Sequence, residues 1–413
     1  MDVIDRPRAE RLLTRSGLLW GAWSAALSAA ALAVAVAVVK ARGRPNLDGL
    51  FNDFYDYWAA GRILQRGGNP YDAGLMSHVL ASAGVHSTVG GAYSYPLLLA
   101  ELARPLAALP PVPAAAVFTA GSLAALWLGM ALLLSPLGRI TPVQGFAVAT
   151  AAGLFAPVVG TLYFGQVNLY LLPLLALALR GARPEAGIAG AAAVKLYPSA
   201  TALAFVTRGR RGVRPLLVTV AAVLGLSLLP NVLAGVWPAR GGALAMVGPD
   251  RFWSNESING WLSRLPLSGL AVTLLMVASG AALGALVLAL VLARRDRPWA
   301  AAFALLLCYG VVAAPKNSLW NFAPLVVAGT QWWSASDRRF RAAALGTLAW
   351  ALVGLQSVVD AAQGFRDGQS VLAGALGSVA LLGGLLLLGM LAHQLLAARP
   401  AAAGRDERER AAA

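Results

Sequence analysis

The sequence predicts an all-α polytopic membrane protein, and its composition and hydrophobic patterning support this fold class. Hydrophobic residues make up 58% of the 413 positions, whereas Asp, Glu, Lys and Arg together account for 12%. A soluble domain carries about 25% charged residues. Apolar residues also form continuous runs here, several longer than the roughly 20 residues that a helix needs to cross a bilayer core. These features exclude a cytosolic enzyme, a small secreted disulfide-bonded domain and a disordered chain.

Charge and cysteine content narrow the class further. Cys308 is the single cysteine, so neither an intrachain disulfide nor a cysteine-based metal cluster can form. The net charge of +15 fits the arginine-rich cytoplasmic loops of a membrane protein. No stretch interleaves basic with aromatic residues in the pattern of a nucleic-acid surface, so nucleic acid is not an expected partner.

Ten apolar runs account for the membrane-spanning part of the chain. The first, residues 17–39, follows a basic segment and is longer than the core of a cleaved signal peptide, so we expect it to remain as a first transmembrane helix. The others lie at residues 114–134, 143–162, 167–180, 214–235, 266–293, 299–313, 318–333, 340–359 and 371–398. Together the runs predict a bundle of about ten transmembrane helices.

Residues 186–206 are apolar but do not fit a simple span. Arginines flank this run on both sides, so a crossing would place one arginine cluster outside the cell. Lys195 and Pro198 lie at its middle, where a charge is costly unless it faces protein or water and where proline interrupts helical hydrogen bonding. We therefore expect a re-entrant or broken helix pair with Lys195 near its tip, beside a polar cavity.

With this hairpin, the distribution of basic residues fixes the topology. Basic clusters at the N-terminus and near residues 139, 180–183, 208–214, 294–297, 338–341 and 405–410 then all face the cytoplasm. Both termini are expected on that side. Residues 1–400 are predicted to form one integral membrane domain, and residues 401–413 a disordered cytoplasmic tail. Lys40, Arg42 and Arg44 are exceptions, because they fall on the outer side.

The first outer segment, residues 40–112, contains a predicted amphipathic helix that begins near Asp53. Helical spacing places Phe54, Tyr57, Trp58 and Gly61 on one face, as in a helix that lies along a membrane surface. A carboxylate at the first turn suits the helix dipole, so Asp53 is either a helix-capping residue or a reactive one. Asp56 lies on another part of the helix surface.

Three further outer segments combine polar and aromatic residues. Gln166 and Asn168 lie at a predicted helix start, where they either cap the helix or bind sugar hydroxyls. The loop at residues 255–264 mixes amide, carboxylate, aromatic and guanidinium groups, which commonly line saccharide sites; its candidates are Asn255, Glu256, Trp261 and Arg264. Lys316 lies in a polar break between two short apolar runs.

In this order the segments resemble the motifs of glycosyltransferase family 87, multi-spanning mannosyltransferases of the GT-C superfamily that use polyprenyl-phosphate sugars. The matching residues are Asp53-Phe54, Asn69-Pro70-Tyr71, Tyr93-x-Tyr95-Pro96, Gly165-Gln166-x-Asn168, Lys195-x-x-Pro198, Asn255-Glu256-Ser257 with Arg264, and Ala314-Pro315. Two departures stand out. Glu256 replaces the usual glutamine, and the late break has Lys316, Asn317 and Trp320-Asn321 instead of the Trp and His-His common in the family.

The resemblance implies a GT-C-like bundle and an enzyme that transfers a hexose, mannose in the family, from a polyprenyl-phosphate donor to a glycolipid or glycan acceptor. It places the active site on the extracytoplasmic face of a bacterial inner membrane, in cell-envelope synthesis, with inversion at the sugar. Asp53 would be the general base, and a cation must hold the departing phosphate. The expected phosphate-binding residues are Lys195, Arg264 and Lys316. The expected sugar- or acceptor-binding residues are Asp56, Tyr57, Tyr95, Gln166, Asn168, Asn255, Glu256 and Trp261. No cofactor and no metal are expected.

Other interpretations remain open from the sequence. A transporter or flippase of lipid-linked sugars also uses buried charges and broken helices. A non-catalytic membrane scaffold would tolerate the loss of Asp53, and a related enzyme would transfer another lipid-linked pentose or hexose. Individually, Lys195 can extend to the membrane interface along its aliphatic stem, and Arg264 can be an ordinary interface anchor.

Overall fold

The protein is helical throughout the residues that its computed structural model describes, which are 12–42, 49–85, 93–135, 141–238, 248–295, 298–336, 340–362 and 378–397. These residues form sixteen α-helices and two 3-10 segments, with an isolated β-bridge between Asn255 and Ser318. The predicted all-α membrane fold is confirmed. The expected tail at residues 401–413 lies outside the described residues, as does Arg44.

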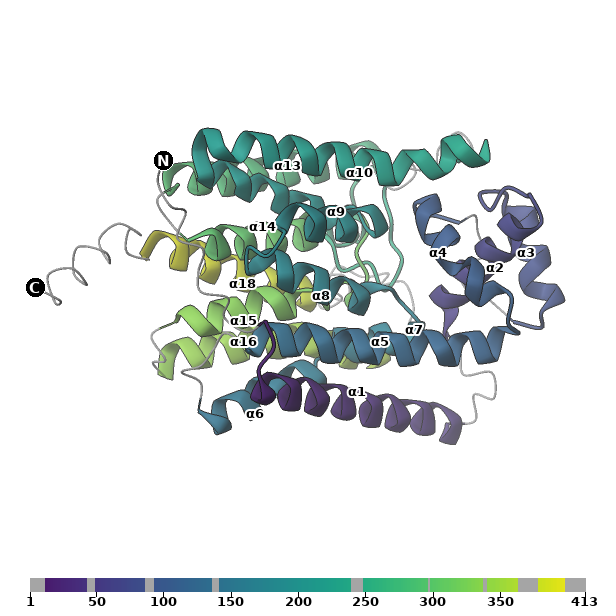
Figure 1. Ribbon diagram of the computed structural model, residues 1–413, viewed down its shortest axis with the longest axis horizontal. Helices are drawn as coiled ribbons and strands as arrows, with labels where there is room; N and C mark the ends of the chain where they lie inside the picture. The colour runs from purple at the N-terminus through teal and green to yellow at the C-terminus, as the bar shows by residue number, and fades with distance from the viewer. Residues whose placement is uncertain are drawn as a thin grey trace, which may run out of the picture.

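The long apolar helices lie side by side along the longest axis of the molecule (Figure 1). Five described segments are long and apolar enough to cross a membrane. Four are single helices: α1 (Arg15–Ala41), α5 (Pro111–Leu134), α13 (Gly269–Ala293) and α18 (Val379–Ala397). The fifth, Tyr197–Ala234, consists of the 3-10 segment η1 and α10 (Val213–Ala234). The bent pair α6 (Pro142–Gly153) and α7 (Ala156–Phe164) would make a sixth. Shorter helices are α8 (Asn168–Leu179), α14 (Trp299–Ala313), α15 (Leu325–Ala335) and α16 (Phe340–Ala362). A described helix overlaps each of the ten predicted apolar runs, while the number of spans stays a prediction.

Helix α1 packs through a stripe of small residues. Its buried residues are Gly17, Gly21, Ser24 and Ser28, and its larger side chains lie mostly on other faces. A Cβ on Gly21 would lie 2.3 Å from the carbonyl oxygen of Trp127, which shows how closely α1 approaches α5. The hydroxyls of Ser24 and Ser28 donate to the carbonyls of Ala149 and Gly153 on α6, both at 2.7 Å. Small residues of this kind allow helices to pack closely in a bilayer, where apolar side chains gain little by leaving lipid.

A broken helix pair occupies residues 184–212, and the break falls where the sequence predicts it. α9 (Pro184–Val194) ends at Lys195, whose backbone is extended, and η1 (Tyr197–Gly212) begins two residues later. α9 packs against α8, α10 and η1. The break therefore places Lys195 between two helices and inside the protein. The re-entrant path of this pair stays a prediction.

Three short helices gather at one end of the bundle (Figure 1): α2 (Asn52–Gln65), α3 (Ala73–Ser82) and α4 (Leu97–Ala107). The start of α1 and the end of α18 lie at the opposite end. α2 packs against α3, α4 and α5, and eleven of its fourteen residues are buried. The expectation of an amphipathic surface helix is therefore wrong for α2, because its polar first turn is covered as fully as its aromatic face.

Candidate active site

A tight turn before α2 places Asp53 in the protein interior. Gly49 and Phe51 adopt positive φ angles of 84° and 58°, and Phe51 immediately precedes the helix. A non-glycine residue in this left-handed region costs about 1–3 kcal/mol and is common at functional sites. The backbone N–H of Phe51 donates to the carbonyl of Tyr163 in α7 at 2.8 Å. The start of α2, with Asp53 as its second residue, is thereby fixed to the junction between α7 and α8.

Gly165 at this junction allows α2 to approach closely. Its φ is 71°, and a Cβ there would lie 2.5 Å from the Cβ of Phe54. Since real Cβ atoms do not approach this closely, only glycine fits both the conformation and the contact. Gly165 therefore lets the helix that carries Asp53 lie directly against the segment that carries Gln166.

We expect Gly165→Ala to destabilise the protein more than a comparable substitution at Gly67. Gly67 has the same φ of 71° but nothing within 4 Å of its Cβ position, so Gly67→Ala isolates the conformational penalty. The clash with α2 should add about 1–3 kcal/mol. Thermal unfolding in detergent measures both variants, and equal losses would show that the contact with α2 is unimportant.

Asp53 is a buried carboxylate with one unused oxygen. Its side chain is 7% exposed, and its Oδ2 has no hydrogen-bond partner among the described residues. Burial raises the pKa of Asp53 from 3.8 to about 6. The hydrogen bond from Gln166 and the positive charge of Lys195 act in the opposite direction and lower the pKa, but burial has the larger effect. A carboxylate with a pKa near neutrality and a free lone pair is suited to accept a proton.

Gln166 connects Asp53 to two tyrosines. The Tyr57 hydroxyl donates to Gln166 Oε1, and Gln166 Nε2 donates to the Tyr95 hydroxyl, both at 2.9 Å. The rings of Tyr57 and Tyr95 meet edge to face with centroids 4.9 Å apart. Burial raises the pKa of both phenols, so they stay neutral. The structure thus brings together four residues that the sequence proposed separately.

Lys195 belongs to the same cluster. Its charge acts on Asp53, and its Nζ lies 5.8 Å from the centroid of the Tyr95 ring, within the range of a cation–π contact. Nζ also donates a hydrogen bond to Oδ1 of Asn321. Asn321 belongs to the 3-10 segment η2 (Leu319–Phe322). An acid and a base from distant parts of the chain therefore lie close together in the interior.

Asn168 and Lys195 donate to the same oxygen atom of Asn321. Its Nδ2 donates to Asn321 Oδ1 at 3.1 Å and to the Trp320 carbonyl at 2.9 Å. The Tyr197 hydroxyl donates to Asn168 Oδ1 at 3.3 Å. We call the complete group the Asp53 cluster: Asp53, Tyr57, Tyr95, Gln166, Asn168, Lys195, Tyr197 and Asn321.

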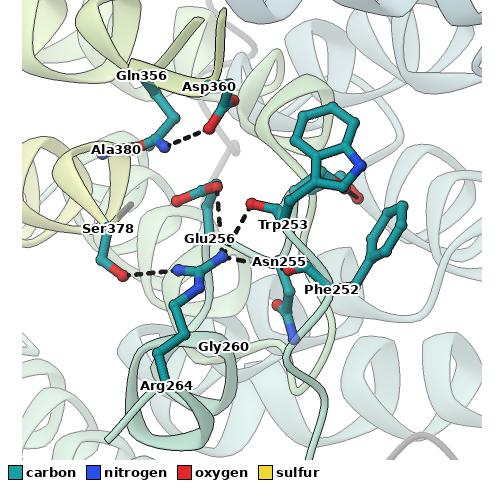
Figure 2. Close-up of polar contacts among 12 residues, drawn as sticks. Phe252, Trp253, Asn255, Glu256, Gly260, Arg264, Gln356, Asp360, Ser378 and Ala380 are labelled. Carbon is teal, nitrogen blue, oxygen red and sulfur yellow. Dashed lines mark hydrogen bonds and ion pairs between the residues drawn. The ribbon is translucent and has the colours of Figure 1, made fainter. Parts of the chain in front are cut away.

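A second polar group, the Arg264 cluster, joins the loop before α12 (Ile258–Ser263) to α16 and α18 (Figure 2). Arg264 Nη1 donates to Ser378 Oγ at 3.0 Å, and Nη2 donates to the carbonyls of Phe252 at 3.2 Å and Trp253 at 2.9 Å. Nη2 also lies 3.9 Å from Glu256 Oε1. Gln356 links α16 to α18, because it donates to Asp360 on its own helix and accepts from the Ala380 N–H on α18. The cluster consists of Phe252, Trp253, Glu256, Arg264, Gln356, Asp360, Ser378 and Ala380.

Glu256 is the most deeply buried acid in this cluster. Its side chain is 0% exposed, and neither carboxylate oxygen has a hydrogen-bond partner among the described residues. Burial raises the pKa of Glu256 well above 4.5; the charge of Asp360 raises it further, and Arg264 lowers it. Burial therefore favours the protonated form of Glu256, which is close in shape and charge to the glutamine expected at this position.

The remaining predicted residues occupy different surroundings. Asn255 Oδ1 accepts from the Ser257 hydroxyl at 2.7 Å and from the Asn317 N–H at 3.1 Å, so this side chain shapes the loop. Lys316 pairs with Asp250 at 3.5 Å in a partly exposed position. Trp261 is 39% exposed, and Asp56 is half-buried. Neither Lys316 nor Arg264 joins the Asp53 cluster, and their assignment to a phosphate stays a prediction.

The sequence analysis did not assign a role to several residues that complete the two clusters. Asn321 and Tyr197 are members of the Asp53 cluster, and Gln356, Asp360 and Ser378 are members of the Arg264 cluster. A signal was present for Gln356 and Asp360, because polar residues four positions apart in an apolar helix share one face. Among the described residues, no group of three His, Cys, Asp or Glu side chains is placed to hold a metal ion.

The family of the chain is found by comparing its sequence with models of known protein families. The model of glycosyltransferase family 87 matches residues 93–315, which is more than half of the chain. The chain belongs to glycosyltransferase family 87. As a member of this family, the protein is a multi-pass membrane transferase that moves a sugar from a donor to an acceptor. No curated protein and no solved structure matches the chain.

The matched region of this family 87 protein contains five of the eight residues of the Asp53 cluster and four of the eight residues of the Arg264 cluster. It includes Tyr95, Gln166, Asn168, Lys195 and the loop that carries Glu256 and Arg264. Asp53 precedes the matched residues, and Lys316 follows them directly. The structure nevertheless places Asp53 against Gln166, which is inside the matched region.

Proposed function

We propose that the protein transfers a hexose, mannose in the first instance, from a polyprenyl-phosphate donor to a lipid-linked or glycan acceptor. Asp53 is the general base, and Lys195 binds the donor phosphate. The observation that carries the proposal is the convergence of Asp53, Gln166 and Lys195, from three distant segments, in one buried cluster. Asp53 offers a free oxygen for the acceptor proton, and Lys195 offers a cation for the leaving phosphate.

The proposed reaction is a single displacement. The acceptor oxygen forms a bond to the anomeric carbon, the bond from that carbon to the phosphate oxygen breaks, and the phosphate leaves with the electron pair. The acceptor proton passes to Asp53 Oδ2, and the charge on the departing phosphate is balanced by Lys195. A single displacement inverts the sugar carbon, so a β-linked donor gives an α-linked product.

The proposed setting is a GT-C-like bundle of about ten spans formed by residues 1–400, in the inner membrane of a bacterium. Both termini are cytoplasmic, and α9 with η1 forms a re-entrant hairpin. α2, α3 and α4 then lie on the extracytoplasmic side, where cell-envelope glycans are built. Support comes from the arrangement in Figure 1, where these three helices lie at the end opposite the start of α1 and the end of α18.

The experiment that tests the proposal is transfer from a radiolabelled mannosyl-phosphoryl-polyprenol to a glycolipid acceptor by the purified protein in detergent. A labelled product of higher mass supports the enzyme. A flippase would move the lipid across a vesicle membrane without forming that product. Failure with mannosyl, glucosyl and pentosyl donors alike would overturn the proposed donor class.

We expect Lys195→Gln to raise the KM for the donor by about tenfold to a hundredfold, because a hydrogen bond to a charged group contributes about 1.5–3 kcal/mol. The acceptor KM should change little. Lys40→Gln is the matched control, since Lys40 lies exposed at the end of α1. An unchanged donor KM in Lys195→Gln would remove Lys195 from the phosphate site.

A further inference from the structure

Asn321 is the direct hydrogen-bond partner of the Lys195 ammonium group. Its Oδ1 accepts from Lys195 Nζ and, at 3.1 Å, from Asn168 Nδ2. A single amide oxygen therefore receives one donor from the break between α9 and η1 and another from the first residue of α8. This arrangement fixes where the ammonium group lies with respect to the rest of the cluster.

The segment that carries Asn321 is itself firmly held. The carbonyl of Trp320 accepts from Thr161 Oγ1 at 3.0 Å and from Asn168 Nδ2 at 2.9 Å. Asn168 is completely buried, and its Oδ1 accepts from the Tyr197 hydroxyl. Three elements, α7, α8 and η1, thus position the 3-10 turn that presents Asn321. The position of Asn321 is therefore set by hydrogen bonds from neighbouring elements of the fold.

The partners that position Lys195 are neutral. Asn321 supplies an amide oxygen, and Tyr95 supplies the face of an aromatic ring. The charge of Asp53 also acts on Lys195, whereas the hydrogen bond from Lys195 Nζ goes to the neutral side chain of Asn321. An amide can orient an ammonium group without cancelling its charge, whereas a carboxylate in the same place would form an ion pair and compete with an anionic ligand.

We infer that Asn321 is a positioning residue for the donor phosphate: it orients Lys195 through a neutral hydrogen bond and so leaves the positive charge available. This inference rests on the proposed function and deepens it. The role of Asn321 depends on its lack of charge. An aspartate has nearly the same shape and would accept the same hydrogen bonds, so charge is the property that distinguishes the two side chains at this position.

Asn321→Asp separates this role from a purely structural one. A structural role would be served equally well by the carboxylate, and the added ion pair with Lys195 would leave the thermal midpoint unchanged or higher. The positioning role predicts instead that the donor KM rises at least about tenfold at pH 8, since the introduced carboxylate competes with the phosphate for Lys195. The ratio of variant to parent donor KM should then fall as pH is lowered and the introduced carboxylate takes up a proton.

The measurement is donor KM and kcat for the parent, Asn321→Asp and Asn321→Ala, each between pH 5 and pH 8, with thermal unfolding of every sample. Asn69→Asp is the matched control, because Asn69 lies in a partly exposed turn outside the Asp53 cluster, where its Oδ1 accepts from the Tyr71 N–H and its Nδ2 donates to the Trp237 carbonyl. Asn321→Ala covers the case in which Asn321→Asp does not fold, and it should raise the donor KM through loss of orientation.

Failure of the inference can be distinguished from failure of the proposed function. If the parent protein transfers sugar and Lys195→Gln raises the donor KM, but both Asn321 variants keep the parent KM, the role of Asn321 is overturned alone. If the parent transfers no sugar from any polyprenyl-phosphate donor, the proposed function itself is overturned.

Discussion

Asp53→Asn is expected to reduce kcat by about 10²–10⁴-fold, the range for removal of a general base. The amide has nearly the same shape, so α2 should keep its place against Gln166 and the protein should remain folded. Asn cannot take the acceptor proton, however, and the unpartnered Oδ2 position is where that proton would be received. Steady-state transfer rates at saturating donor and acceptor measure this loss.

The pH dependence gives a second, independent expectation for Asp53. Only the deprotonated carboxylate accepts a proton, and burial raises its pKa to about 6. The rate should therefore be low below pH 6 and rise through pH 6 as Asp53 ionises. The residual activity of Asp53→Asn should lack this rise.

Asp72→Asn is the matched control for Asp53→Asn. Asp72 precedes α3 and accepts from the N–H groups of Gly74 and Leu75 on the exposed side of the helix start. Asparagine serves as well as aspartate at such a position, so this variant should keep the parental activity. Full activity in Asp53→Asn, or an equal loss in both variants, would contradict the role of Asp53 as base.

The positions of the helices follow from the sequence because a bilayer imposes a strong constraint on composition. The predicted apolar runs at residues 17–39, 114–134 and 266–293 correspond closely to α1, α5 and α13. The burial of α2, by contrast, could not be predicted from the composition of its sequence. Its aromatic face suggested contact with lipid, but the covering elements α3, α4 and α5 are supplied by the tertiary fold.

For the site as well, single residues could be predicted from the local sequence, but the contacts between them could not. Lys195 stood out because a charge in the middle of an apolar run needs a reason, whereas Asp53 and Gln166 stood out by their positions at predicted helix starts and in motifs that resemble those of the family. Their convergence in space depends on contacts across more than a hundred residues, such as the one between Tyr57 and Gln166. Asn321 was not predicted to be functional, because a single amide in a short turn has the same local appearance as a capping residue.

Arg264→Met is expected to destabilise the protein by about 1–3 kcal/mol, because it removes a buried donor that serves several acceptors at once. The side chain of Arg264 is 2% exposed, and its guanidinium group lies between Glu256, two backbone carbonyls and Ser378 (Figure 2). Methionine fills a similar volume but donates no hydrogen bond, so the two carbonyls and Ser378 would each lose the hydrogen bond from Arg264. Thermal unfolding in detergent, with size-exclusion profiles, measures the loss.

Arg104→Met is the control for the loss of an arginine that is not buried. Arg104 pairs with Glu101 at 2.9 Å, with side chains 46% and 30% exposed, and such surface pairs contribute about 0–1 kcal/mol. If Arg264→Met unfolds no more readily than Arg104→Met but binds the donor less tightly, then Arg264 acts on the phosphate instead of supporting the loop.

Glu256→Gln should have the opposite effect to Arg264→Met. Because burial raises the pKa of Glu256 above 4.5, the folded protein holds a proton that the unfolded chain releases above that pH. The stability contributed by this group is therefore complete below pH 4.5 and declines as pH rises towards the raised pKa. Glutamine is neutral at every pH, so Glu256→Gln should be as stable as the parent at low pH and more stable at pH 8. A variant less stable than the parent at pH 8 would show that Glu256 is ionised beside Arg264 and that their charge pair holds the loop to α18.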